Sequence, residues 1–329
     1  MEVRVLEPRP EKKMSAWRNS YVLKKLAGLR IEEVIAYIFF IPSLAITFRA
    51  NFHLWLQDYG LGRKIEGGVW RIAIVACLLP LIPYLSRRSE TSPLFARLRK
   101  ALPFALCIAI YTNLHDTIHF VNPHDVQEWF LKADVWLFGI EPTLWVQQFY
   151  RPWLTELFSF CYAFYLPLTI LLPVVLYWKR KDQEARITLL GLVLCFYWGY
   201  FFYILFPAVP PRIAIADQYT HSLGGSFWLG TQNEMVSITE TSSRAAFPSL
   251  HSAITLLTLI YSWKFERRLF WFLLPLGSGL IAATIYLRHH YVVDLLAGFP
   301  LGVLSYRYSP AWDRKWEKWR VKLAELTAK

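Results

Sequence analysis

The chain contains 329 residues, of which 55% are hydrophobic, 17% aromatic and 18% charged, and its formal net charge is +12. The apolar residues form blocks of 17 to 26 residues, and about 20 apolar residues are enough to cross a bilayer as a helix. Blocks of this length exclude an ordinary soluble enzyme. The high apolar content excludes a disordered chain, and the presence of only four cysteines excludes a disulfide scaffold.

The apolar blocks, bounded by charged residues, Pro and Gly, predict eight membrane-spanning helices. In chain order they lie at about residues 33–49, 69–85, 101–121, 153–178, 186–206, 247–264, 269–287 and 290–307. We therefore expect an all-α integral membrane protein. The blocks divide the chain into a basic tail (1–31), N-terminal helices (32–121), an outer interfacial segment (122–152), a second group of helices (153–307) and a basic C-terminal tail (308–329).

The number of Lys and Arg residues alternates between high and low in successive loops. The basic segments, which hold eight, five, four, three and six of these residues, are 1–31, 86–100, 179–186, 264–268 and 308–329. The intervening loops hold one or two each. Because cytoplasmic loops carry an excess of Lys and Arg, both termini are expected in the cytoplasm. This alternation also accounts for most of the positive charge without a nucleic-acid partner.

The outer side of the third block and the loop after it contain further polar residues. Residues 122–152 mix acids with Trp and Phe, which is typical of helices that lie in the membrane interface. His115, Asp116 and His119 lie near the end of the block, and the two histidines are four residues apart. That spacing suits a metal ion. Contact with a lipid headgroup and an ordinary interfacial position are the alternatives.

Ionisable residues at the outer ends of three predicted helices are the strongest functional candidates, because such residues are costly at membrane depth. They occur in residues 207–212 (PAVPPR), 244–251 (RAAFPSLH) and 288–294 (RHHYVVD). Pro248 suits the first turn of a helix, so free backbone N–H groups near Ser249 and His251 would favour an anion.

The pair His290 and Asp294 predicts an oriented imidazole. Residues four apart share one face of a helix, so the carboxylate can accept the proton of one ring nitrogen while the other nitrogen points at a substrate. Such an imidazole can act as a nucleophile or a base.

These motifs resemble the type 2 phosphatidic acid phosphatase superfamily of integral membrane phosphoesterases. Ser249-Leu-His251 matches its Ser-x-His motif, and His290 to Asp294 matches its His-x-x-x-Asp motif. The strings FPSLHS (247–252) and HHYVVD (289–294) resemble the branch that contains fungal inositol phosphorylceramide synthase, as do the segment 134–142 and the Pro-Pro-Arg212 loop. The resemblance covers roughly residues 110–307 and implies a six-helix catalytic core.

The chain departs from the phosphatase pattern at four positions. Leu205 stands where that pattern has Lys, Ile213 where it has Pro after Arg212, and Ala283 and Thr284 where it has Ser-Arg. The loss of these charges favours the transferase-like branch over a plain phosphatidate phosphatase.

The resemblance also implies roles for the catalytic residues. His290 would attack phosphorus to form a phosphohistidine, and Asp294 would hold its tautomer and stabilise the imidazolium. His251 would protonate the leaving alcohol and later deprotonate the acceptor. The scheme requires no metal and no cofactor.

Four residues are candidates for binding the phosphate oxygens. The resemblance assigns this role to Arg212 and Ser249. We add Arg244 and Arg288, which are the obvious substitutes for the missing charges. For these two, the alternative is that the cation simply extends to the membrane interface.

Together these features predict a lipid phosphotransferase whose site faces outward or into a lumen, in a bacterial inner membrane or a eukaryotic endomembrane. It would pass the phospho-headgroup of a phospholipid to an alcohol such as ceramide or diacylglycerol. One alternative is a lipid or polyprenyl (di)phosphate phosphatase, with water as the acceptor. The other is a transporter or scramblase that binds anionic lipids without chemistry.

Overall fold

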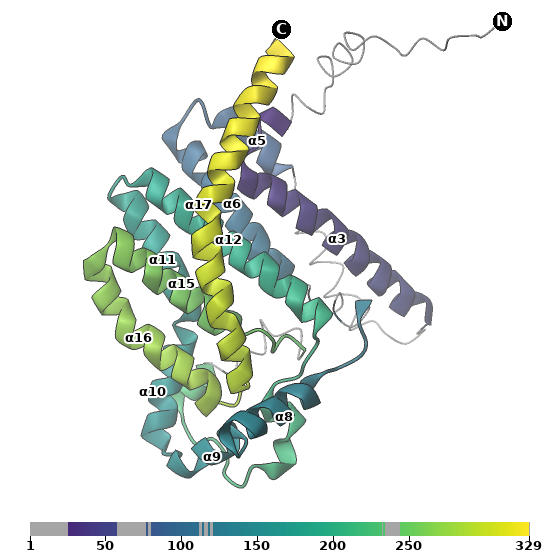
Figure 1. The fold of residues 1–329 in the computed structure, drawn as a ribbon, viewed down its shortest axis with the longest axis vertical. Helices are drawn as coiled ribbons and strands as arrows, with labels where there is room; N and C mark the ends of the chain where they lie inside the picture. Colours follow the sequence, from purple (N-terminus) through teal and green to yellow (C-terminus); the bar gives the residue numbers. More distant parts are fainter. Residues whose placement is uncertain are drawn as a thin grey trace, which may run out of the picture.

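The described part of the chain is helical. The computed structural model describes residues 26–57, 77, 80–111, 114, 118, 121–231, 233 and 244–328. Within these residues, the helices are accompanied by an isolated parallel β-bridge between Ala208 and Ala245, which joins two loops. The expected all-α fold is therefore confirmed for this part of the chain (Figure 1).

The helices follow the order of the predicted blocks. They are α3 (Ile31–Gln57), α5 (Leu81–Arg88), α6 (Pro93–Tyr111), α8 (Gln127–Phe138), α9 (Pro142–Val146), α10 (Pro152–Ala163), α11 (Tyr165–Trp178), α12 (Asp182–Leu205), α13 (Pro211–Ala214), α15 (Leu250–Phe265), α16 (Arg267–Tyr286) and α17 (Val292–Ala328), with short 3₁₀ turns η1 (Gln147–Phe149) and η2 (Ala216–Gln218). Most of the second predicted block, 69–85, lies outside the described residues.

Several helices have the length and composition of membrane spans. Among the described residues, α12 and α16 are each long and apolar enough to cross a membrane, and α10 and α11 qualify as one bent span. The chain is therefore a membrane protein. The number of eight spans stays a prediction.

The fourth predicted block forms two helices instead of one. α10 and α11 meet at a bend of 43° around Phe164. Pro167 explains the break, because its ring has no N–H to donate to the carbonyl of Ala163 and would clash with that carbonyl in a continuous helix. The bend directs the first turn of α11 toward the start of α15, as the ring contacts of Tyr165 show below.

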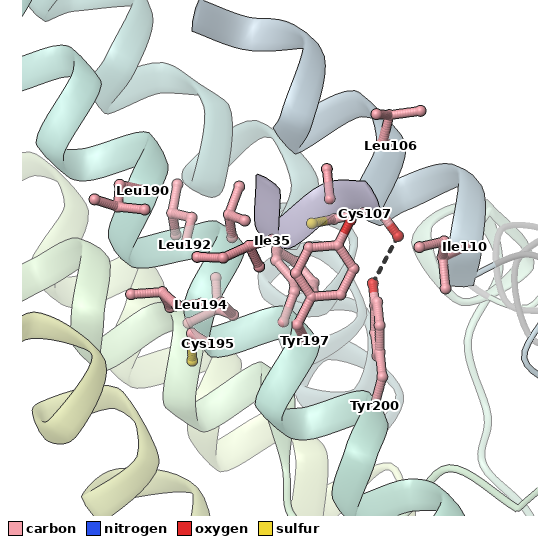
Figure 2. Close-up of a cluster of buried hydrophobic side chains, with 14 of the residues drawn as sticks. Ile35, Leu106, Cys107, Ile110, Leu190, Leu192, Leu194, Cys195, Tyr197 and Tyr200 are labelled. Atoms are coloured by element: carbon pink, nitrogen blue, oxygen red, sulfur yellow. Dashed lines mark hydrogen bonds between the residues drawn. The ribbon is translucent and has the colours of Figure 1, made fainter. Parts of the chain in front are cut away.

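α12 forms the centre of the bundle. Most of its residues are buried, on every side of the helix, which is the pattern of a helix surrounded by others. Its neighbours are α3, α6, α11, α15 and α17. Tyr200 of α12 donates a hydrogen bond to the carbonyl of Cys107 in α6, with an O···O distance of 2.9 Å (Figure 2). Tyr197 lies beside this pair and is also buried.

α15 and α17 pack with their backbones unusually close together. A side chain at Gly298 would place its Cβ 2.5 Å from the carbonyl oxygen of Ser249, and one at Gly302 would place it 2.5 Å from that of Ala253. The two glycines form a GxxxG pattern on α17, which permits such an approach between membrane helices. This contact sets the spacing between the two helices that carry the candidate catalytic residues.

A buried group of charges joins α3 to the rest of the bundle. Arg186 of α12 pairs with Glu32 of α3 at 3.1 Å and with Asp313 of α17 at 2.7 Å. All three are at least nine-tenths buried, so each charge depends on its partners. The C-terminal part of α17 lies at the opposite end of the bundle from α8 and α9 (Figure 1).

Candidate active site

The Ser249–His251 motif stands at the start of α15. The helix begins at Leu250, two residues after Pro248, so the expectation that Pro248 lies in the first turn is wrong. Ser249 is the N-cap, and its Oγ accepts a hydrogen bond from the backbone N–H of Ser252 at 3.3 Å. Serine is among the preferred N-cap residues because its hydroxyl satisfies one of the free N–H groups there. His251 consequently lies in the first turn, at the positive end of the helix.

His290 and Asp294 meet, although they do not share a helix. α17 begins at Val292, so the expectation that both residues lie on one helical face is wrong for His290. The His290 Nδ1 atom nevertheless lies 3.3 Å from Asp294 Oδ2. A tight connector replaces the helix, because the backbone N–H groups of His289 and His290 both donate to the carbonyl of Thr284, at 2.8 and 3.1 Å.

The three predicted catalytic residues form one continuous line. His290 Nε2 lies 3.2 Å from Nδ1 of His251, on the side opposite Asp294. The backbone N–H of Ser249 also donates to the carbonyl of Asp294 at 2.9 Å, which ties the start of α15 to that of α17. Asp294 is fully buried and His290 is 3% exposed. The carboxylate can therefore orient His290, and the second nitrogen of His290 faces a further imidazole.

Two tyrosines, which the sequence motifs did not indicate, pack against the histidine rings. The Tyr162 ring stacks on His251 and His289, with centroid distances of 4.7 and 4.4 Å. Tyr165 contacts His251 at 4.4 Å. Both tyrosines flank the bend between α10 and α11, and only the presence of Pro167 in an apolar block hinted at a bend there.

Arg212 and Arg288 lie beside this line. The backbone N–H of Arg212, in α13, donates to the carbonyl of Arg288 at 3.0 Å. The charge of Arg212 acts on both His289 and His290. Arg212 is therefore placed to supply positive charge at the site, and phosphate binding by this residue stays a prediction.

Arg288 is enclosed by aromatic rings. Its guanidinium lies 3.7 Å from the centroid of Tyr219 and 4.9 Å from that of Tyr150. Its Nε donates to the Tyr150 hydroxyl at 2.8 Å, and an Nη donates to the carbonyl of His221. These contacts tie the loop after α13 to the connector before His290. Phosphate binding by Arg288 stays a prediction.

Arg244 and Ser249 also make structural contacts. Arg244 pairs with Asp125, ahead of α8, at 2.9 Å. The Ser249 hydroxyl, fully buried, caps α15 as described above. Neither contact tests a role in phosphate binding, which stays a prediction for both.

Asp134 of α8 touches the start of α17. Its two carboxylate oxygens accept hydrogen bonds from the backbone N–H groups of Val292 and Val293, at 2.7 and 2.9 Å. Burial raises the pKa of the Asp134 carboxyl to about 6, so it is mostly ionised at neutral pH and can accept both bonds. The sequence analysis noted the motif 134–142 but assigned it no role.

A metal site finds no support within the described residues, where no group of three or more His, Cys, Asp or Glu side chains is arranged to hold an ion. His115, Asp116 and His119 lie outside them. The described residues of the site supply an oriented imidazole, a second imidazole within reach and nearby cationic side chains.

Comparison with known proteins identifies relatives that are named as phosphoinositol ceramide synthases or as related to PA-phosphatases. A "Phosphoinositol dihydroceramide synthase" of Bacteroides thetaiotaomicron is 30% identical over 166 residues, which cover 45% of this chain and 52% of the relative. An "Inositol phosphorylceramide synthase" of Candida albicans is 25% identical over 285 residues, covering 82% and 48%. A "PA-phosphatase related-family protein" of Dictyostelium discoideum is 29% identical over 131 residues, covering 39% and 24%. The chain thus spans about half the length of these relatives or less, and no solved structure matches it.

A family model, described as the PAP2 superfamily, matches residues 128–308. The match covers more than half of the chain and includes His251, His290 and Asp294 together with Asp134. The expected family resemblance is confirmed: the chain belongs to the PAP2 superfamily.

Proposed function

We propose that the protein is a membrane-embedded lipid phosphotransferase that works through a phosphohistidine. The observation that carries this proposal is the line from Asp294 through His290 to His251, with interatomic distances of 3.3 and 3.2 Å. An imidazole held by a carboxylate on one side and facing a proton donor on the other is the arrangement that a two-step transfer requires.

In the first step, the phosphoester group binds between His251 and His290, and the hydrogen bond between the two rings is broken. The Nε2 atom of His290 attacks phosphorus, the bond to the leaving alcohol oxygen breaks, and His251 gives that oxygen a proton. Asp294 accepts a hydrogen bond from the Nδ1–H of His290 and stabilises the positive charge that develops on the ring. The product of this step is a phosphohistidine that carries the headgroup.

In the second step, the acceptor hydroxyl attacks the same phosphorus. His251 removes the hydroxyl proton, and the bond between phosphorus and His290 breaks. Charge on the phosphate oxygens needs stabilisation in both steps. We assign this task to Arg212, to Ser249 and to backbone N–H groups in the first turn of α15, with Arg244 and Arg288 as additional cations.

The names of the relatives suggest the substrates. They favour a phosphoinositol lipid as donor and ceramide or dihydroceramide as acceptor. With a lipid phosphate monoester or diphosphate as donor, water as the acceptor would make the protein a lipid phosphatase, and the name of the Dictyostelium relative keeps this second activity open. Since water and an alcohol would use the same histidines, the site geometry alone suits both.

We further propose a topology of eight spans with both termini in the cytoplasm and the site on the extracytoplasmic or lumenal face. The division into segments 1–31, 32–121, 122–152, 153–307 and 308–329 belongs to this proposal. It is supported by the alternation of Lys and Arg between loops.

The function is tested by product analysis. Purified protein is incubated with a panel of headgroup-labelled phospholipids, with and without ceramide or diacylglycerol, and the products are separated by chromatography. Label on the acceptor lipid supports a transferase. A phospho-headgroup released from a diester, or inorganic phosphate released from a lipid phosphate, in both conditions supports a hydrolase. His290→Ala serves as the inactive control. If neither product forms from any donor, the proposed function is wrong.

A further inference from the structure

The start of α17 depends on two carboxylates from different parts of the chain. Asp294, in the first turn, accepts a hydrogen bond from the backbone N–H of Tyr291 at 3.0 Å, which is half of a capping box. In an ordinary capping box, the side chain of the residue before the helix supplies the other half. Here Tyr291 stands at that position, and its hydroxyl instead donates to the carbonyl of Val209 at 2.9 Å.

Asp134 of α8 supplies a second side-chain acceptor at this helix start. It accepts the N–H groups of Val292 and Val293, the first two residues of the helix, although it lies 158 and 159 residues away in sequence. Asp134 is fully buried, so these bonds are shielded from water. Without Asp134, these buried N–H groups would lose their acceptor, which is destabilising, and they would compete for the carboxylate of Asp294.

Aromatic packing places α8 against both helix starts. Phe130, one turn before Asp134, stacks on Phe247 with a centroid distance of 4.4 Å and lies 6.1 Å from the Tyr291 ring. Phe247 lies three residues before the start of α15, and Tyr291 directly precedes that of α17. The same face of α8 therefore contacts the two segments that carry His251 and His290.

We propose that Asp134 is a positioning residue: it completes the cap of α17 so that the Asp294 carboxylate remains directed at His290. The inference rests on the proposed phosphohistidine mechanism. Asp134 acts through the backbone of Val292 and Val293, and the bond from Ser249 N–H to the Asp294 carbonyl extends its effect to α15.

The test uses full-length protein with three substitutions at one position. Asp134→Ala removes both acceptors, Asp134→Asn keeps one oxygen that can accept one bond, and Asp134→Glu keeps the carboxylate on a longer side chain. We expect kcat to fall by about 100-fold in Asp134→Ala, the usual effect of displacing a catalytic group by about 1 Å, with KM little changed. Asp134→Asn should retain more activity than Asp134→Ala.

Two acidic residues of the same region provide matched controls. Glu128 lies on α8, is exposed and pairs with Lys132 at 3.6 Å. Glu141 is buried and caps its own helix, α9, by accepting the N–H of Leu144 at 2.9 Å. Glu128→Gln should change neither stability nor kcat. Glu141→Gln should lower thermal stability without the loss of kcat per folded molecule.

Hydrogen exchange over residues 289–297 gives a readout that does not need substrate. We expect faster exchange in Asp134→Ala than in wild type and no such change in Glu141→Gln. The inference is wrong if Asp134→Ala keeps wild-type kcat per folded molecule, if only KM rises, or if exchange in this segment is unchanged. Absence of all transfer and hydrolysis in the wild type would instead refute the proposed function, and exchange would then decide the role of Asp134 in the cap.

Discussion

His289 and His290 are neighbours with different surroundings. The His290 ring lies between Asp294 and His251, whereas the His289 ring stacks on Tyr162 at 4.4 Å. His290→Ala should abolish turnover and the covalent phosphohistidine together, a loss of about 10⁴-fold or more, as for other essential nucleophiles. His289→Ala should have a much smaller effect, because no step of the mechanism uses its ring. Labelling with a radioactive-phosphate donor, followed by turnover assays, distinguishes the two.

Equal losses in the two histidine variants would mean that the nucleophile has been assigned to the wrong residue. A phosphorylated intermediate that persists in His290→Ala would lead to the same conclusion. Tyr162→Phe keeps the ring that stacks on His289 and serves as a control for damage to packing.

Asp294 receives two hydrogen bonds through the same oxygen, from the His290 ring and from the N–H of Tyr291. In Asp294→Asn, an amide oxygen can still accept one bond, but it cannot stabilise an imidazolium. We expect turnover to fall by about 10⁴-fold, as in the comparable change in a serine protease triad. Specific activity is measured against the folded fraction from size-exclusion chromatography. Near-normal turnover per folded molecule would remove Asp294 from the mechanism.

At the scale of elements, the close contact between α15 and α17 sets the distance between His251 and His290. In Gly302→Ala, the new Cβ would meet the carbonyl of Ala253 at 2.5 Å, and backbone atoms must move to relieve the clash. We expect a loss of about 1–3 kcal/mol in stability, typical of overpacking, and reduced turnover in the molecules that fold. Thermal unfolding in detergent and activity assays provide the two measurements.

Gly230→Ala is the matched control for this variant, because a Cβ at Gly230 would have no atom within 4 Å. If Gly302→Ala behaves like Gly230→Ala in both measurements, the close approach of the two helices does not determine the catalytic geometry.

The elements also show which features a sequence can reveal. His251, His290 and Asp294 occur within short strings, so their grouping at one site was predictable from the sequence. The spacing of four residues correctly predicted contact between His290 and Asp294, but the expected helix is absent at His290. A turn held by the carbonyl of Thr284 brings the two side chains together instead. The role of Asp134 was not predictable, since it depends on packing between segments about 158 residues apart.

The whole molecule has its candidate site at one end and a buried charge group toward the other. If the loops alternate across the membrane as proposed, the loop after α13 lies outside the cytoplasm. Single cysteines at Ser222 and Gly230, introduced into a variant without native cysteines, should then react with an impermeant thiol reagent in intact cells. Both positions are exposed. A cysteine at Arg268, in the first turn of α16 and within the basic segment 264–268, should react only after lysis.

The opposite orientation would follow if cysteines at positions 222 and 230 were labelled only after lysis and a cysteine at position 268 were labelled in intact cells. The same pattern would place the candidate active site in the cytoplasm, where its substrates would have to be presented from the inner leaflet.

Along α17, the distance between the candidate site and the buried charge group is close to the thickness of a membrane. Asp294 at the site and Asp313 in the buried charge group lie on one continuous helix, nineteen residues apart. At about 1.5 Å per residue, this separation is about 28 Å, close to the roughly 30 Å hydrocarbon thickness of a bilayer. In thinner or thicker bilayers, the helix must tilt or the lipid must deform, which would shift the candidate site away from the layer of lipid headgroups. We therefore expect activity in reconstituted vesicles to be highest with lipids of intermediate acyl length and to fall on either side, whereas activity in detergent should be independent of the acyl length of the added substrate.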